Sequence, residues 1–149
     1  MAVSKKPHTV VTGIYRPGKK GRVMLPVYSS RIPAGFPSPA DDFVEKKLDL
    51  NEHLIKNPAA TFIVKVSGNS MTGAGIHSGD HLLVDRSLEP GDRKIVVAAL
   101  DGELTVKRLR QRNGRMYLAS ENPDYPEVKL DDLADLKIWG VVTFVIHKV

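Results

Sequence analysis

Short runs of β-branched and other apolar residues, separated by turn residues, dominate the chain from residue 60 onward. Strands are predicted over residues 61–66, 81–85, 94–100, 103–110, 115–119 and 137–147. Asp-Gly at 101–102 and Asn-Gly at 113–114 separate neighbouring runs, and such pairs favour tight hairpin turns. Trp139 and Phe144 are expected to be large apolar anchors of the last strand. The pattern predicts a compact, mostly β domain.

One short helix is expected before these strands. Asp49 suits the N-cap position, and Glu52 follows three residues later as in a capping box. The helix should run over about residues 50–56 and end before Pro58, which disfavours helical geometry in the preceding residue. Its apolar side chains are expected to face the core: Leu50, Leu54 and Ile55.

The first 40 residues follow no helical pattern, because six prolines and four glycines interrupt them. Only Thr9–Tyr15 and Arg22–Tyr28 could form short extended pieces. We therefore expect a mobile, extended N-terminal arm over residues 1–40 that docks by strand-like contacts, and a β-rich domain over residues 41–149. The arm is too short and too broken for the two packed helices of a helix-turn-helix, so sequence-specific DNA binding is not expected.

Charge is divided unevenly between these parts. The chain has a net charge of +5, yet residues 1–40 hold seven basic residues and no acidic one, whereas residues 41–149 hold 15 basic and 17 acidic residues. Contact of the arm with a polyanion or an acidic partner is one interpretation, and a solvated basic tail is the other.

Composition excludes several classes of protein. The chain has no cysteine, which excludes disulfides, cysteine nucleophiles and thiolate zinc sites. No apolar run approaches the about 20 residues that span a bilayer, and the N-terminal lysines are not followed by the apolar region of a signal peptide. A cytoplasmic protein without a membrane contact or a cofactor is expected.

Ser70 and Lys107 are the candidate catalytic residues. A serine hydroxyl becomes a nucleophile when a base takes its proton, and a lysine can be that base when burial keeps it neutral. Strand alternation places Lys107 on one face with Thr105 and Leu109, and the hypothesis requires this face to be buried. A solvent-facing strand lysine and an ordinary loop serine are the alternative interpretations, which these residues alone leave open.

Two further features bear on this chemistry. The turn around Gly68 could align the backbone N–H groups of Asn69 and Ser70 as an oxyanion hole. His77 and His81 have i,i+4 spacing, but the intervening Ser-Gly pair disfavours a helix, and no metal site is expected. Upstream, Ala34-Gly35 offers a peptide bond between small residues in an extended, proline-flanked stretch, so the chain could contain both a protease and its substrate.

Several stretches together resemble the UmuD-type SOS mutagenesis proteins, which share the S24 serine peptidase domain with LexA-like repressors. The matching stretches, in order, are residues 34–40 (a cleavage region), 64–71 (a nucleophile block), 76–85 (a strand block), 101–109 (a lysine block) and 138–142 (a closing strand). The resemblance covers residues 34–149. It implies a compact domain like the LexA C-terminal domain, self-cleavage between Ala34 and Gly35, a Ser70 nucleophile and a Lys107 general base.

The resemblance also implies partners. It implies activation by a RecA-type recombinase filament on single-stranded DNA, a homodimer, and association with a UmuC-type error-prone Y-family polymerase in the bacterial cytoplasm. Cleavage would yield the active subunit for translesion synthesis. The alternatives are a LexA-like self-cleaving repressor, a leader peptidase, which would normally need a membrane anchor, and a non-enzymatic module with a basic arm.

Overall fold

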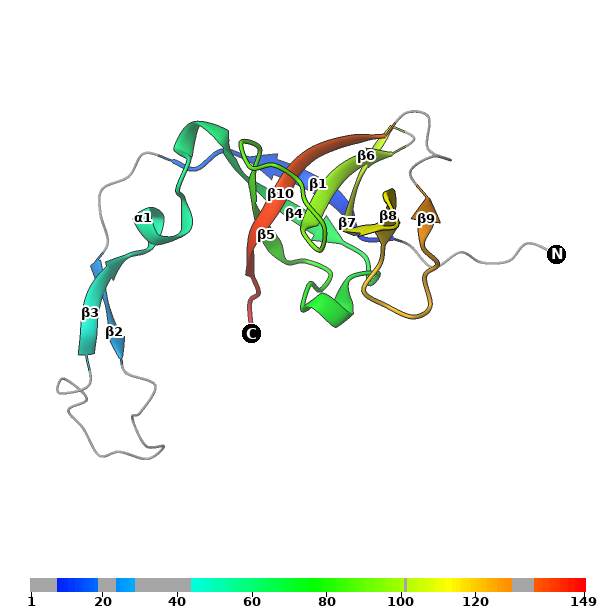
Figure 1. The fold of residues 1–149 in the computed structure, drawn as a ribbon. Helices are drawn as coiled ribbons and strands as arrows, with labels where there is room; N and C mark the ends of the chain where they lie inside the picture. The colour runs from blue at the N-terminus through cyan, green and yellow to red at the C-terminus, as the bar shows by residue number, and fades with distance from the viewer. Residues whose placement is uncertain (1–7, 19–23, 29–43, 101, 130–135) are drawn as a thin grey trace. The chain divides into compact units, whose positions relative to one another are not determined.

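The computed structural model of the chain describes residues 8–18, 24–28, 44–100, 102–129 and 136–149. These residues form two compact units, one from the described parts of Met1–Pro17 and Asn57–Val149, the other from those of Gly18–Lys56. Strands dominate both units, and the described part contains one short α-helix (Figure 1). The prediction of a mostly β fold is confirmed.

The larger unit is an antiparallel sheet in which six strands form a closed ring. Its strands follow one another in the sheet in the order β1-β4-β5-β10-β6-β7-β8-β9, and β1 also pairs with β7. The pairs between β1 and β4 and between β1 and β7 therefore close the ring (Figure 1). The bounds are β1 Val10–Tyr15, β4 Thr61–Ser67, β5 His81–Asp85, β6 Ile95–Leu100, β7 Glu103–Arg112, β8 Arg115–Ala119, β9 Val128–Lys129 and β10 Lys137–Ile146.

The six strands predicted between residues 61 and 147 are all present, with bounds within two residues of the predicted ones. Asn113 and Gly114 have φ values of 52° and 74° and join β7 to β8 in a tight turn, as expected. Gly102, with φ 78°, follows Asp101, which lies outside the described residues. The extended piece expected near residues 9–15 is β1, so the predicted arm contains a strand of the large sheet.

Among the described residues, the core has two clusters of buried apolar side chains. The cluster inside the ring is lined by side chains from β4, β5, β6 and β7, and Trp139 packs against it as expected. The other cluster contains Val96, Ala98, Leu109, Leu118 and Val141. Phe144 instead is 37% exposed, so its predicted role as a core anchor is wrong. The reason is positional: β10 pairs with β6 from Lys137 to Val141 and with β5 from Val141 to Ile146, so Phe144 lies beyond the part that pairs with β6. The end of the strand runs past the core.

The smaller unit contains an antiparallel pair, β2 Met24–Tyr28 and β3 Val44–Asp49, and the helix α1 Leu50–Leu54. Asp49 is the N-cap, as predicted, and its carboxylate accepts a hydrogen bond from Asn51 N at 3.1 Å. The helix ends at Leu54, and none of its residues is buried, so the expectation that Leu50 faces a core is wrong. The buried apolar side chains of the described residues lie in the larger unit. No described helix has the length and apolar composition needed to cross a membrane.

Candidate functional site

Ser70 lies in the turn that follows β4, with a fully buried side chain. Gly68 makes this turn possible, because it has φ +112° and a Cβ there would lie 2.3 Å from the His8 carbonyl oxygen. Its N–H donates to Ser78 Oγ at 3.3 Å. The glycine lets the N-terminal segment approach closely, and the turn directs Ser70 inward.

Lys107 lies on β7 and is only 3% exposed. Thr105 and Leu109, on the same face of the strand, are buried too, as the dyad hypothesis requires. The Lys107 Nζ donates to Ser120 Oγ at 2.6 Å and lies 5.9 Å from the centre of the Tyr125 ring. Burial away from water lowers the pKa of Lys107 to about 8, because desolvation disfavours the charged amine.

Two consecutive residues of the N-terminal segment connect Ser70 with Lys107. Thr9 N donates to Ser70 Oγ at 2.8 Å, and His8 Nδ1 lies 2.6 Å from Lys107 Nζ. Because the Cα atoms of adjacent residues are about 3.8 Å apart, the serine and the lysine converge on one short stretch of backbone. The structure thus brings the two predicted catalytic side chains to a common site.

The site lies between the edges of β4 and β7, here termed the cleft, and the N-terminal segment of the same chain fills it. Val10 pairs with Ser67 of β4 and with Thr105 of β7, while Val106 N donates to the Thr9 carbonyl oxygen at 3.0 Å. The segment from residue 8 onward therefore lies extended between the strand that leads to Ser70 and the strand that carries Lys107. Main-chain pairing of this kind is how a sheet edge binds an extended peptide.

The expected oxyanion donors, the backbone N–H groups of Asn69 and Ser70, lie in the turn that follows β4. Ser70 N donates to Thr9 Oγ1 at 3.1 Å, so this N–H already faces an oxygen atom in the cleft. Asn69 is exposed, and its carbonyl oxygen accepts from Asn122 Nδ2 at 2.9 Å. Ala34 and Gly35, the expected cleavage site, lie outside the described residues.

Four residues of the site escaped the sequence analysis: His8, Thr9, Ser120 and Tyr125. For Ser120 a signal existed. The 113–114 turn fixes the β7–β8 register, in which Arg108 pairs with Ala119, and one step further places Lys107 opposite Ser120. For His8 and Thr9 we find no local signal, because their place depends on a pairing with residues more than 50 positions away.

The sequence analysis considered His77 together with His81, but the structure places His77 beside a different histidine. His77 lies with Asp80 and His147, whereas His81 is outside that cluster. Among the described residues, these three form the group whose metal-ligating atoms lie close together, all within 4.8 Å of one another.

Comparison with known proteins identifies the family of the chain. Residues 26–143 match the family described as Peptidase S24-like. Protein SamA of Salmonella typhimurium is 50% identical over 123 residues, which cover 83% of this chain and 85% of SamA. Protein MucA of Escherichia coli is 47% identical over 120 residues, or 80% of this chain and 82% of MucA.

A repressor is a more distant relative. The LexA repressor of Bordetella petrii is 37% identical over 127 residues, which cover 85% of this chain but 56% of the repressor. These matches confirm the resemblance to UmuD-type proteins and, more distantly, to LexA. The chain belongs to the S24 peptidase family, as its match over residues 26–143 shows.

Proposed function

We propose that the chain is a self-cleaving serine peptidase of the SOS mutagenesis type, with Ser70 as nucleophile and Lys107 as general base. Ser70 Oγ attacks the carbonyl carbon of Ala34 while Lys107 Nζ takes the hydroxyl proton. The bond from Ala34 to Gly35 then breaks, and the proton passes to the departing Gly35 amine. Water hydrolyses the resulting ester and frees Ser70. The observation that carries the proposal is the convergence of Ser70 and Lys107 on residues 8 and 9.

The surroundings of Lys107 suit a base. With a pKa of about 8, roughly a tenth of the side chains are neutral at pH 7, a far larger fraction than for a lysine in water. The hydrogen bond to Ser120 Oγ orients the amine. The N–H groups of Asn69 and Ser70 would stabilise the oxyanion, and Ser70 N already donates to an oxygen atom in the cleft.

Occupancy of the cleft by His8 and Thr9 would keep the peptidase inactive until it is activated. The scissile segment needs the place beside Ser70 and Lys107 in which His8 and Thr9 lie. Residues 8–15 must therefore leave before Ala34 can reach the serine. A recombinase filament on single-stranded DNA would act as a co-protease by favouring this exchange, without contributing catalytic groups.

The cleaved product, residues 35–149, would be the active form. We propose that the chain forms a homodimer in the bacterial cytoplasm before and after cleavage. The cleaved product would serve a UmuC-type error-prone Y-family polymerase in translesion synthesis. Similarity to SamA and MucA, which extends over four-fifths of the chain, supports this assignment. The exposed apolar residues at the end of β10 (Phe144, Val145 and Ile146) support self-association.

The test is incubation of the full chain with and without recombinase filaments, followed by intact-mass measurement. A fragment that begins at Gly35 is expected, with filaments accelerating its formation. Ser70→Ala and Lys107→Ala should each abolish the fragment while leaving the circular dichroism spectrum unchanged. Ser67→Ala and Lys65→Ala alter exposed residues of β4 and should cleave normally. A Gly35 terminus from either catalytic variant would contradict the dyad.

A further inference from the structure

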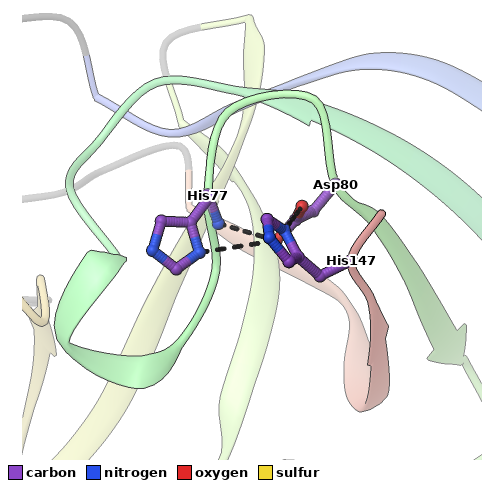
Figure 2. Close-up of side chains that lie close together, drawn as sticks. All are labelled: His77, Asp80 and His147. Carbon is purple, nitrogen blue, oxygen red and sulfur yellow. Dashed lines mark hydrogen bonds and ion pairs between the residues drawn. The ribbon is translucent and has the colours of Figure 1, made fainter. Parts of the chain in front are cut away.

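Three side chains that the peptidase proposal does not use meet at one place in the larger unit. Figure 2 shows His77, Asp80 and His147 directed toward one another. His77 and Asp80 come from the loop that leads into β5, and His147 directly follows β10. Residues 67 positions apart in the sequence thus meet here.

Asp80 is the fixed centre of this cluster. Its side chain is buried, and its Oδ2 accepts from the backbone N of His77 at 2.8 Å. His147 Nδ1 lies 2.6 Å from Asp80 Oδ1 (Figure 2). The Asp80 carbonyl oxygen accepts from Val66 N at 3.0 Å, which anchors the residue to β4. The carboxylate is therefore positioned by the fold before any ligand binds.

The two histidines supply adjustable partners. Both side chains are about half exposed, and the ring centroids are 5.1 Å apart. His77 Nδ1 lies 3.9 Å from Asp80 Oδ2. A tetrahedral Zn²⁺ with N and O ligands needs ligand atoms roughly 3.4 Å apart. Small rotations of the exposed rings would bring the ligand atoms, now within 4.8 Å of one another, to that spacing. The 2.6 Å contact between His147 Nδ1 and Asp80 Oδ1 would lengthen as the metal replaces the hydrogen bond.

We propose that His77, Asp80 and His147 form a binding site for a divalent transition metal of the zinc class. Two imidazoles and one carboxylate are a ligand set that zinc accepts, and solvent at the exposed histidines would supply the fourth ligand. The backbone N–H of His77 would remain on Asp80 as an outer-shell hydrogen bond that orients the carboxylate.

Bound metal would join two parts of the unit that are distant in sequence. It would tie the segment after β10 to the loop at residues 77–80, and that loop is bonded to the end of β4. Gly79 N donates to Val66 O at 2.8 Å, and Ser78 Oγ accepts from Gly68 N at 3.3 Å. Since the Ser70 turn begins at this end of β4, the metal would stabilise the base of the nucleophile turn without touching the serine.

The experiment is a calorimetric titration of ZnCl₂ into the full chain without a histidine tag. One Zn²⁺ per chain should bind saturably and raise the melting temperature. His147→Ala should weaken binding at least about tenfold, the size of loss that even an outer-shell change can cause. Asp80→Asn, which keeps an acceptor for His77 N, should weaken it similarly and still fold.

His81→Ala is the matched control, because His81 follows Asp80 directly but lies outside the cluster. It should bind Zn²⁺ as the unaltered chain does. Absence of saturable binding by the unaltered chain would overturn the proposal. So would equal affinity in the His147→Ala variant, or a loss of binding in His81→Ala as large as in His147→Ala.

Discussion

At the scale of one residue, Lys107 shows what strand alternation predicts about burial and what it leaves open. Alternation grouped Lys107 with Thr105 and Leu109, and all three are buried. Alternation could not identify the inner face, because Val106 on the other face is buried as well. Packing provides the explanation: Val106 belongs to one buried cluster and Leu109 to another, so side chains cover both faces of the central part of β7.

The pH dependence of self-cleavage should report the Lys107 amine. Burial lowers its pKa to about 8, so the fraction of neutral amine increases as the pH rises toward 8. Deprotonation is nearly complete above about pH 9. We expect the filament-independent rate to rise about tenfold per pH unit below 8 and then level off. Timed intact-mass measurement of fragment 35–149 between pH 6.5 and 9.5 checks this, and a flat profile would contradict a lysine base.

Gly140 illustrates a residue fixed by packing. A Cβ at this position of β10 would lie 2.5 Å from Val84 Cγ1, a core atom of the neighbouring strand. Gly140→Ala should lower the free energy of unfolding by about 1–3 kcal/mol, the usual cost of overpacking. Gly91→Ala is the control, since nothing lies within 4 Å of its added Cβ. Urea denaturation should separate the two variants, and equal midpoints would contradict the packing argument.

At the scale of elements, the sequence predicted what is local. The β7–β8 hairpin follows from its Asn-Gly turn, and the helix start follows from Asp49. The pairings of β1 with β4 and of β10 with β5 join distant segments, and no short pattern encodes them. For the same reason Ser70 and Lys107 could be proposed from their sequence blocks, whereas the residues that occupy the cleft could not.

Weakening the hold of β1 on the cleft should speed cleavage. Thr9→Pro removes the N–H that donates to Ser70 Oγ and the hydroxyl that accepts from Ser70 N. Each bond contributes about 1 kcal/mol, so the loss of both should open the cleft roughly thirtyfold more often. The rate of fragment formation should rise by a similar factor, while the melting temperature falls.

Thr12→Ser is the matched variant for that comparison. Thr12 is an exposed residue of β1, and this variant keeps the hydroxyl that donates to Lys65 O at 3.3 Å, away from the serine. It should cleave at the unaltered rate. If Thr9→Pro lowers the melting temperature but leaves the cleavage rate unchanged, departure of β1 does not limit the reaction.

At the scale of the whole molecule, the end of β10 offers an exposed apolar stretch among the described residues that suits self-association. Val145 is 36% exposed within an apolar stretch and should lie at the dimer interface. Val145→Lys should shift the full chain from dimer to monomer in sedimentation velocity, because an interface that buries a charge loses affinity. Leu88→Lys alters an isolated apolar residue that is 41% exposed and should remain dimeric. A dimeric Val145→Lys chain would place the interface elsewhere.

Closure of the ring by β1 has a consequence for the cleaved protein. While residues 1–149 are one chain, β1 is tethered to its cleft, and a tethered segment has an effective concentration in the millimolar range. Cutting between Ala34 and Gly35 would end that tether and make β1 a separate peptide at the concentration of the protein itself. The strand would then exchange with solvent, and the vacated edges of β4 and β7 could accept an extended segment of another protein. Self-cleavage would thereby turn an internal strand into a replaceable ligand.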